Sequence, residues 1–326
     1  MRHPYLIRLD EPEDWLRVNI DRDPKTGELN EESHDILLPE GSDQLYEFND
    51  SYFYGETGYH EHTIGYETFF IHKGEMDLFI NGKLTTVGPD DIIFVPPYTA
   101  HKMIMLAKPV IWNGLFHSKG EIQLLDDWSF IVQSYPELME EPEIQASYVG
   151  ESTNIVREEV PYAERVSKYE MSAVRPLDRP INTFEFPGIT MKQYTGRWEN
   201  AGKTELWLAD MKKGFKAVYK KVNFNTDVFY VREGEVKFAV AGEEFVAGPR
   251  CVVKVPHFAP REFEALTDAK MFDMGGSTHW LDFFTNMRSI SKLQPEKLSD
   301  KEYIDKVFSA HECKLQSVTY NGTKIL

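Results

Sequence analysis

The feature that most constrains the fold of this chain is an internal repeat. A shift of 160 positions aligns residues 60–101 with residues 220–261 without a gap. The positions shared by the two copies are mostly turn formers, whose backbone angles a fold dictates: Gly74 and Gly234, Gly82 and Gly242, Gly88-Pro89 and Gly248-Pro249, and Val95-Pro96 and Val255-Pro256. One fold is therefore expected to be built twice, and the 326 residues have room for about two domains of ordinary size.

The first copy carries residues of the kind that binds metals. His60 and His62 alternate, and side chains two apart on a β-strand point to the same face, so both imidazoles can reach one point in space. Glu67 opens the next apolar stretch, where a carboxylate is costly unless something positive meets it. His101 follows the Pro96-Pro97 turn. The histidine pair has the spacing of metal ligands.

These residues resemble the two sequence motifs of the cupin superfamily. The first motif is His-x-His, four residues, Glu, six residues, Gly, and it holds over residues 60–74; the second, Pro-x-x-x-x-His, holds over residues 96–101. Asp90 and Tyr98 occupy positions where the family usually has glycine, which affects the shape of the loops. The resemblance implies a small antiparallel barrel that binds one divalent metal through His60, His62, Glu67 and His101.

The fold class that follows is dominated by β-structure. We expect two tandem double-stranded β-helix (cupin) barrels with a few helices between and after them. Residues 1–150 would form a metal-binding N-terminal cupin barrel with a capping helix, and residues 151–326 a degenerate C-terminal cupin barrel with C-terminal helices.

The second copy has different chemistry at the ligand positions. His60, His62, Glu67 and His101 align with Lys220, Val222, Asp227 and Arg261. Lysine and arginine are cations at neutral pH and valine has no lone pair, so the second barrel is expected to bind no metal. Lys220, Asp227 and Arg261 are expected to form an internal ion-pair network. An anion site or a dimerisation site that uses Lys220 and Arg261 is the alternative.

Local patterns predict further elements. Strands are expected at residues 5–9 and near residues 36–38, both at the edge of the first barrel, and Asn81-Gly82 predicts a tight hairpin. Apolar residues at near-helical spacing in residues 122–132 predict the capping helix, and the stretch 134–152, rich in Glu and Pro, predicts a linker.

Two helices are expected after the second barrel. Apolar residues recur three and four positions apart in residues 279–293, which predicts an amphipathic helix. Ser299 and Glu302 have the spacing of a capping box that starts another helix. Their apolar stripes are expected to pack in the core, with a subunit interface as the alternative.

Charge and composition exclude several classes of partner. The chain has 53 acidic and 36 basic side chains, a net charge of −17, which repels nucleic acids and anionic membranes. It shows neither a signal peptide nor an apolar run of membrane length, and its two cysteines are too few for a disulfide framework. We therefore expect a cytoplasmic protein that takes a small-molecule substrate, forms a homodimer, and binds neither nucleic acid nor membrane.

The ligand types limit the metal. Three neutral imidazoles and a carboxylate, without a thiolate, suit Mn, Fe, Ni, Co or Zn. One divalent metal per chain is expected, with Mn(II) preferred and Fe(II) or Zn(II) as alternatives. Four protein ligands leave about two open positions on a six-coordinate metal, enough for a substrate that binds through two oxygen atoms.

The surroundings of the ligands suggest a substrate class. The aromatic residues near them in sequence favour a flat, neutral or enolate ring, with ordinary barrel core as the alternative: Tyr52, Tyr54, Tyr59, Phe69 and Tyr98. The chain also resembles, more weakly, the Mn-dependent cupin hydrolases of the dihydrophloroglucinol cyclohydrolase type. That resemblance implies breakdown of aromatic compounds by hydrolytic opening of a cyclic 1,3-diketone.

In such a hydrolase the nucleophile would be hydroxide generated at the metal, with Glu67 and Tyr54 as the catalytic residues that move protons. Three alternatives stay open. They are a ring-cleaving or quercetinase-like dioxygenase with the same ligands, a non-catalytic binding cupin, and a sugar isomerase.

Overall fold

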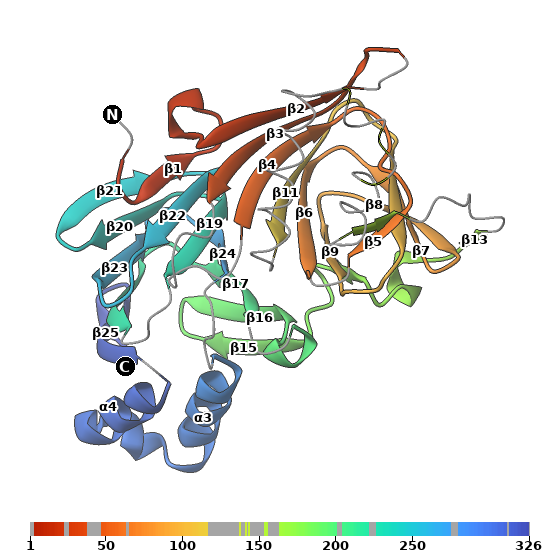
Figure 1. Ribbon diagram of the computed structural model, residues 1–326. Coiled ribbons are helices and arrows are strands. Elements are labelled where there is room, and N and C mark those ends of the chain that lie inside the picture. The colour runs from red at the N-terminus through yellow and green to blue at the C-terminus, as the bar shows by residue number, and fades with distance from the viewer. Residues whose placement is uncertain are drawn as a thin grey trace. The chain divides into compact units, whose positions relative to one another are not determined.

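The computed structural model describes residues 3–22, 26–37, 47–62, 65–116, 137, 141, 143, 153–155, 163–200, 204–221, 226–274, 280–311 and 313–325. These residues are mostly β-strand and form two compact units. Each unit is a barrel made of two sheets (Figure 1). No helix in the described ranges is both long and apolar enough to cross a membrane.

The first barrel contains the described residues of 15–37 and 47–179. Its seven-stranded sheet has the order β14-β9-β6-β11-β4-β3-β2, and these strands span, in that order, Val174–Pro176, Asp91–Val95, Glu67–Lys73, Val110–Phe116, Glu47–Phe53, Leu29–Leu37 and Arg17–Arg22. Its six-stranded sheet has the order β12-β5-β10-β7-β8-β13, spanning Thr153–Ile155, His60–His62, His101–Met105, Met76–Ile80, Lys83–Val87 and Glu164–Arg165. Alternating apolar residues of both sheets, such as Phe69, Leu78 and Met103, form the core between them.

The second barrel contains the described residues of 3–14 and 180–325. Its seven-stranded sheet, β1-β22-β19-β24-β17-β16-β15, spans Leu6–Arg8, Cys251–Val255, Asp227–Glu233, Ala269–Asp273, Leu206–Met211, Ile189–Thr195 and Asn182–Phe186. Its six-stranded sheet, β21-β20-β23-β18-β25-β26, spans Glu243–Ala247, Val236–Val240, Pro260–Ala265, Phe215–Lys221, Cys313–Tyr320 and Thr323–Lys324. The core again lies between the two sheets.

The two barrels repeat one another strand by strand. Strands β6 to β9 have the same bounds as β19 to β22 after a shift of 160 positions. Turn geometry repeats as well: φ is 49° at Asn81 and 51° at Ala241, and 57° at Tyr98 and 60° at Phe258. Asn81 and Gly82 both have positive φ, as a two-residue hairpin turn requires. The internal repeat therefore predicted the duplicated fold correctly.

Each barrel takes one edge strand from the stretch that precedes the other repeat. β1 pairs with β22 of the second barrel, and β14 pairs with β9 of the first. The exchange is symmetric, because Leu9 N–H donates to the Arg250 carbonyl and Leu177 N–H donates to the carbonyl of Asp90, its counterpart in the repeat.

This exchange corrects two expectations. The strand predicted at residues 5–9 edges the second barrel and not the first, because its backbone hydrogen bonds go to β22. The compact units also differ from the contiguous halves 1–150 and 151–326, since the described residues of 153–155 and 163–179 belong to the first barrel, with which they pair through β12, β13 and β14.

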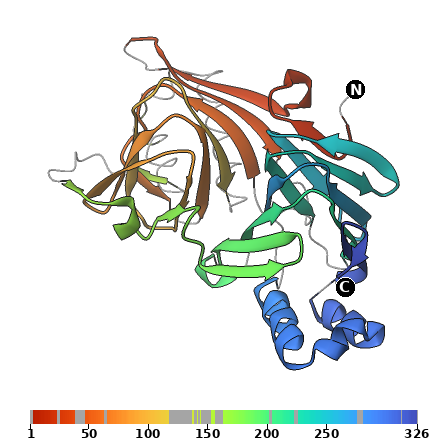
Figure 2. The ribbon, with the colours of Figure 1, turned by 180° about the vertical axis from the view of Figure 1, so that it is seen from behind.

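The expected C-terminal helices are present as α3 (Trp280–Leu293), which lies beside the β15–β16 hairpin, and α4 (Lys301–Ala310), which packs against β25 (Figure 2). Their apolar faces pack into the core of the second barrel. The cap of α4 differs from the prediction by one residue. Asp300 caps the helix by accepting from the Tyr303 N–H, whereas the Ser299 hydroxyl donates to the Glu296 carbonyl within a preceding 3-10 turn. Asp and Ser are about equally good cap residues, so local sequence does not choose between neighbours.

Two other expectations fall on residues that are not described. The capping helix at 122–132 lies wholly outside the described residues, and so does the linker at 134–152 except for 137, 141 and 143.

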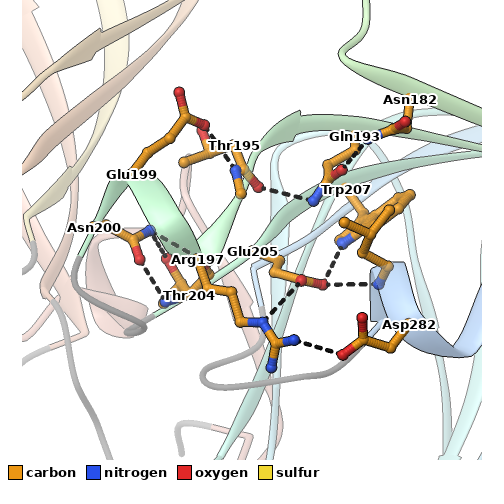
Figure 3. A network of polar contacts seen from close by, with 12 residues as sticks. Asn182, Gln193, Thr195, Arg197, Glu199, Asn200, Thr204, Glu205, Trp207 and Asp282 are labelled. Carbon is orange, nitrogen blue, oxygen red and sulfur yellow. Dashed lines mark hydrogen bonds and ion pairs between the residues drawn. The ribbon is translucent and has the colours of Figure 1, made fainter.

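A buried carboxylate ties the start of α3 to the second barrel. Glu205, 1% exposed, accepts hydrogen bonds from the Trp207 indole at 3.0 Å and from the Leu281 backbone N–H at 3.3 Å (Figure 3). Arg197 lies 3.7 Å away and also pairs with Asp282 at the start of the helix. Burial raises the pKa of Glu205 to about 7, although these donors and the Arg197 charge oppose the rise.

The raised pKa predicts a pH-dependent stability. Between the unfolded value of 4.5 and about 7, the folded protein keeps a proton on Glu205 that the unfolded chain releases. The free energy of unfolding should therefore fall as pH rises through this window and then level off. In the wild type this decrease should be on the order of 2 kcal/mol, since one pKa unit is about 1.4 kcal/mol. Glu205→Gln, which keeps a hydrogen-bond acceptor but does not titrate, should show no such decrease. Urea unfolding of both proteins at pH 5 and pH 8 measures it, and equal pH dependence in the two would contradict the assignment.

Candidate metal centre

Three strands of the first barrel place the predicted ligands together. β5 carries His60 and His62, β10 begins with His101, and β6 begins with Glu67. His101 and His60 are directly opposed residues on paired strands. The turn before β10 is held by a 2.7 Å hydrogen bond from the Tyr98 N–H to the His62 carbonyl. Side chains from the ends of strands in both sheets therefore converge.

Distances between the donor atoms are those of ligands that share one ion. One ring nitrogen from each of His60, His62 and His101 lies within 4.8 Å of the others. The Glu67 carboxylate lies 3.0 Å from His62 Nε2 through one oxygen and 3.1 Å from His101 Nε2 through the other. Ligands about 2.1 Å from a metal and at right angles to each other are about 3 Å apart. The structure brings all four predicted residues together.

Backbone carbonyls fix two of the imidazoles in a metal-binding tautomer. His60 Nδ1 lies 2.8 Å from the Gly58 carbonyl, and His101 Nδ1 lies 2.8 Å from the Thr99 carbonyl. A carbonyl only accepts, so Nδ1 carries the proton in both rings and Nε2 keeps its lone pair. Backbone carbonyls have no sequence signature, so the sequence did not indicate these two contacts.

Electrostatics keep His60 and Glu67 in the ionisation states that metal binding needs. Burial, helped by the nearby His101, lowers the pKa of His60 to about 4, so its imidazole is neutral at neutral pH. Burial alone would raise the pKa of Glu67, but His62 and His101 hold it well below its ordinary value. Metal ligands bind as neutral imidazole and carboxylate.

The site also contains buried polar atoms that the protein leaves without hydrogen bonds. Glu67 Oε2 and His101 Nε2 are fully buried and are close to each other, yet neither makes a hydrogen bond. Such atoms are rare in folded proteins and call for an explanation. A divalent cation explains both, so the residues fit the metal that the motifs imply.

Some of the aromatic residues predicted near the metal ligands lie in the barrel core, and others are exposed at the surface. Phe69 is buried and packs on Trp112, with ring centroids 4.7 Å apart, so it belongs to the core. Tyr98 is 69% exposed and has a left-handed backbone, which explains why glycine is usual at its position. Tyr59 is partly buried against Phe79, and burial followed by the Glu61 charge raises the pKa of its phenol. Tyr54 is half-buried, and its catalytic role stays a prediction.

The corresponding place in the second barrel holds an ion pair. Arg261 and Asp227, each with a side chain 1% exposed, are in direct contact. This contact is the expected pairing of these two residues. Val222 lies outside the described residues, as does the Lys220 side chain, so the third member of the expected network stays a prediction.

Comparisons with known proteins agree with this architecture. The family described as Cupin domain matches residues 54–113, which include all four predicted ligands. No curated protein is found to match the chain.

Solved structures of oxalate decarboxylase resemble the whole chain. One, concerned with substrate binding mode and reaction specificity, has a TM-score of 0.56 at 14% identity and covers 97% of this chain and 89% of its own. Another, concerned with the Mn(II) centres of the Bacillus subtilis enzyme, has a TM-score of 0.53 at 13% identity with the same coverage. At this identity the likeness shows the fold alone. The chain folds as two tandem cupin barrels, whereas these matches do not support the weaker resemblance to cyclic-diketone hydrolases.

Proposed function

We propose that the protein is a metal-dependent enzyme that cleaves a carbon–carbon bond in a small molecule with two neighbouring oxygen donors. The supporting observation is the convergence of four side chains. The ring nitrogens of the three histidines lie within 4.8 Å of one another, and the Glu67 carboxylate lies 3.0 Å from His62 Nε2 and 3.1 Å from His101 Nε2. Manganese(II) is the metal that we propose for this site, one per chain, with His60, His62, Glu67 and His101 as its ligands.

The finer proposal is hydrolytic opening of a cyclic 1,3-diketone. A divalent cation at these four residues supplies Lewis-acid chemistry, since it polarises a carbonyl and lowers the pKa of bound water. In the balanced reaction the oxygen of water joins one carbonyl carbon, the bond from this carbon to its neighbour breaks, and the neighbouring carbon takes up a proton. The product is one carboxylic acid per ring opened.

The chain's own residues would position the substrate and move the proton. His60 and His101 are held by backbone carbonyls and keep the site in place. Glu67 stays ionised between His62 and His101 and can accept a proton from water. The Tyr54 phenol is the proposed donor to the leaving carbon.

The charge of the loaded site is compatible with a ketone substrate. A divalent cation together with the single Glu67 carboxylate would leave the site with a net positive charge, which accepts a neutral diketone or its singly charged enolate. The exposed Tyr98 at the turn beside His62 offers a flat ring such as this a stacking surface.

A second candidate is decarboxylation of a small dicarboxylate. It is favoured by the likeness of the fold to oxalate decarboxylase. Both candidates break a carbon–carbon bond in a substrate that can bind through two oxygen atoms.

Turnover by the purified Mn(II)-loaded protein separates the candidates. Under argon, cyclohexane-1,3-dione should yield 5-oxohexanoic acid without uptake of oxygen, and Glu67→Gln should abolish this turnover while His72→Ala, a change at an exposed residue on the same strand, should not. Release of CO₂ from oxalate would instead support the decarboxylase, and consumption of oxygen with a catechol or flavonol would support a dioxygenase. No turnover with any of these compounds, despite bound metal, would contradict an enzyme of this kind and favour a binding protein.

A further inference from the structure

The second barrel contains an apolar cavity at the end covered by α3 and α4. Its walls come from both sheets, through residues such as Phe229 and Ala217, and from α3, through Trp280 and Phe284. The free volume is about 110 Å³. We propose that this cavity is a binding site for a neutral, apolar molecule the size of one six-membered ring.

The size and the lining set the class of ligand. An apolar protein cavity of about 150 Å³ stays dry and binds benzene or xenon, because water finds no hydrogen-bond partners there. The cavity in the second barrel is of similar size, and all but one of its lining residues are apolar. A molecule that fills the cavity makes dispersion contacts with its apolar walls.

The lining of the cavity disfavours anions. Asp273, 7% exposed, is the one lining residue with an ionisable side chain, and the others are apolar. An anion that enters such a cavity loses its hydration to apolar walls, which is costly. A neutral ring is therefore accepted and a ring with a carboxylate group is excluded.

The cavity is separate from the residues that align with the metal ligands. Asp227 and Arg261 lie two positions before Phe229 and Phe263 on β19 and β23, and they pair with each other. Their charges satisfy one another, which leaves the apolar side chains that follow on the same faces to form the walls. The first barrel therefore has polar ligand residues in its interior, whereas the second barrel has an apolar cavity.

The helices that cover the cavity are held in place by defined contacts. The Leu281 N–H in the first turn of α3 donates to the buried Glu205. Phe283 of α3 packs edge-on against Phe308 of α4, with ring centroids 4.6 Å apart. Both phenylalanines line the cavity. The roof is therefore part of the folded barrel, and the site is formed before the ligand arrives.

A ligand-observed ¹⁹F NMR titration tests the proposal on the full-length protein with fluorobenzene. Binding should saturate at one molecule per chain. Toluene should displace the fluorobenzene and benzoate should not. Ala217→Leu, which fills the cavity, should weaken binding by at least about tenfold, and Ala209→Leu on the opposite sheet should do the same if the first variant does not fold. Ala239→Leu, the same change at a half-buried residue of this barrel that does not line the cavity, should leave binding unchanged.

The result can be distinguished from that of the metal centre, because His62→Ala should bind fluorobenzene as the wild type does. Absence of saturable binding would overturn the proposal. So would wild-type affinity in a folded Ala217→Leu or Ala209→Leu variant, or equal displacement by benzoate and toluene.

Discussion

Replacing His62 by alanine is expected to leave the protein with almost no bound divalent metal. His62 is 8% exposed and its Nε2 lies 3.0 Å from Glu67, so no other side chain can move in to replace the lost donor without displacing the carboxylate. Loss of even an outer partner of a metal ligand lowers affinity about 10–100-fold. Loss of a ligand itself should exceed about 100-fold. Elemental analysis after dialysis against a weak chelator measures the metal per chain.

Two variants show whether the loss of metal is specific to His62. One removes a histidine outside the metal site, and the other changes a buried residue of the second barrel. His72→Ala removes an imidazole from β6 at an exposed position and should keep one metal per chain. Asp227→Ala, in the second barrel, should also keep it. Retention of the metal by His62→Ala, or its loss in His72→Ala, would show that the first barrel does not hold it as proposed.

The second large effect concerns stability. Asp227→Ala should lower the free energy of unfolding by about 3–5 kcal/mol, because it leaves the Arg261 guanidinium buried without its carboxylate. Both side chains are 1% exposed, so water cannot easily replace the lost partner. Urea unfolding followed by circular dichroism measures the change.

A double replacement separates loss of the charge pair from loss of packing. Asp227→Leu combined with Arg261→Met removes both charges, and it should recover most of the lost stability, because paired apolar residues can replace a buried ion pair. Lys212→Ala breaks an exposed pair with Asp268 in the same barrel and should change the free energy of unfolding very little, because water screens this pair. If Asp227→Ala costs no more than Lys212→Ala, the buried pair has no structural role.

The sequence predicted the convergence of the four residues because they obey short-range rules. The alternation of His60 and His62 places both on one strand face, and the repeat fixes the turns between the strands. The identity of a strand's partner is not local information, however. The three-residue strand β1 could be predicted as a strand, but its pairing with the second barrel depends on backbone hydrogen bonds to residues some 240 positions away.

Other features depend on side chains brought together only by the fold. The Glu205 cluster joins β17 to the start of α3, and the sequence around Glu205 contains no motif that predicts a buried carboxylate. The cavity in the second barrel is likewise set by volumes that do not quite fill the space between two sheets and two helices. The periodicity of the sequence identifies which residues face the interior, but it does not predict the volume of the cavity left between their side chains.

Anomalous diffraction from crystals of the manganese-loaded protein tests the central claim most directly. The account predicts one strong peak per chain at the manganese absorption edge, about 2.0–2.2 Å from the donor atoms of His60, His62, Glu67 and His101. A peak beside Asp227 and Arg261 in the second barrel, or none among the four residues of the first, would contradict it.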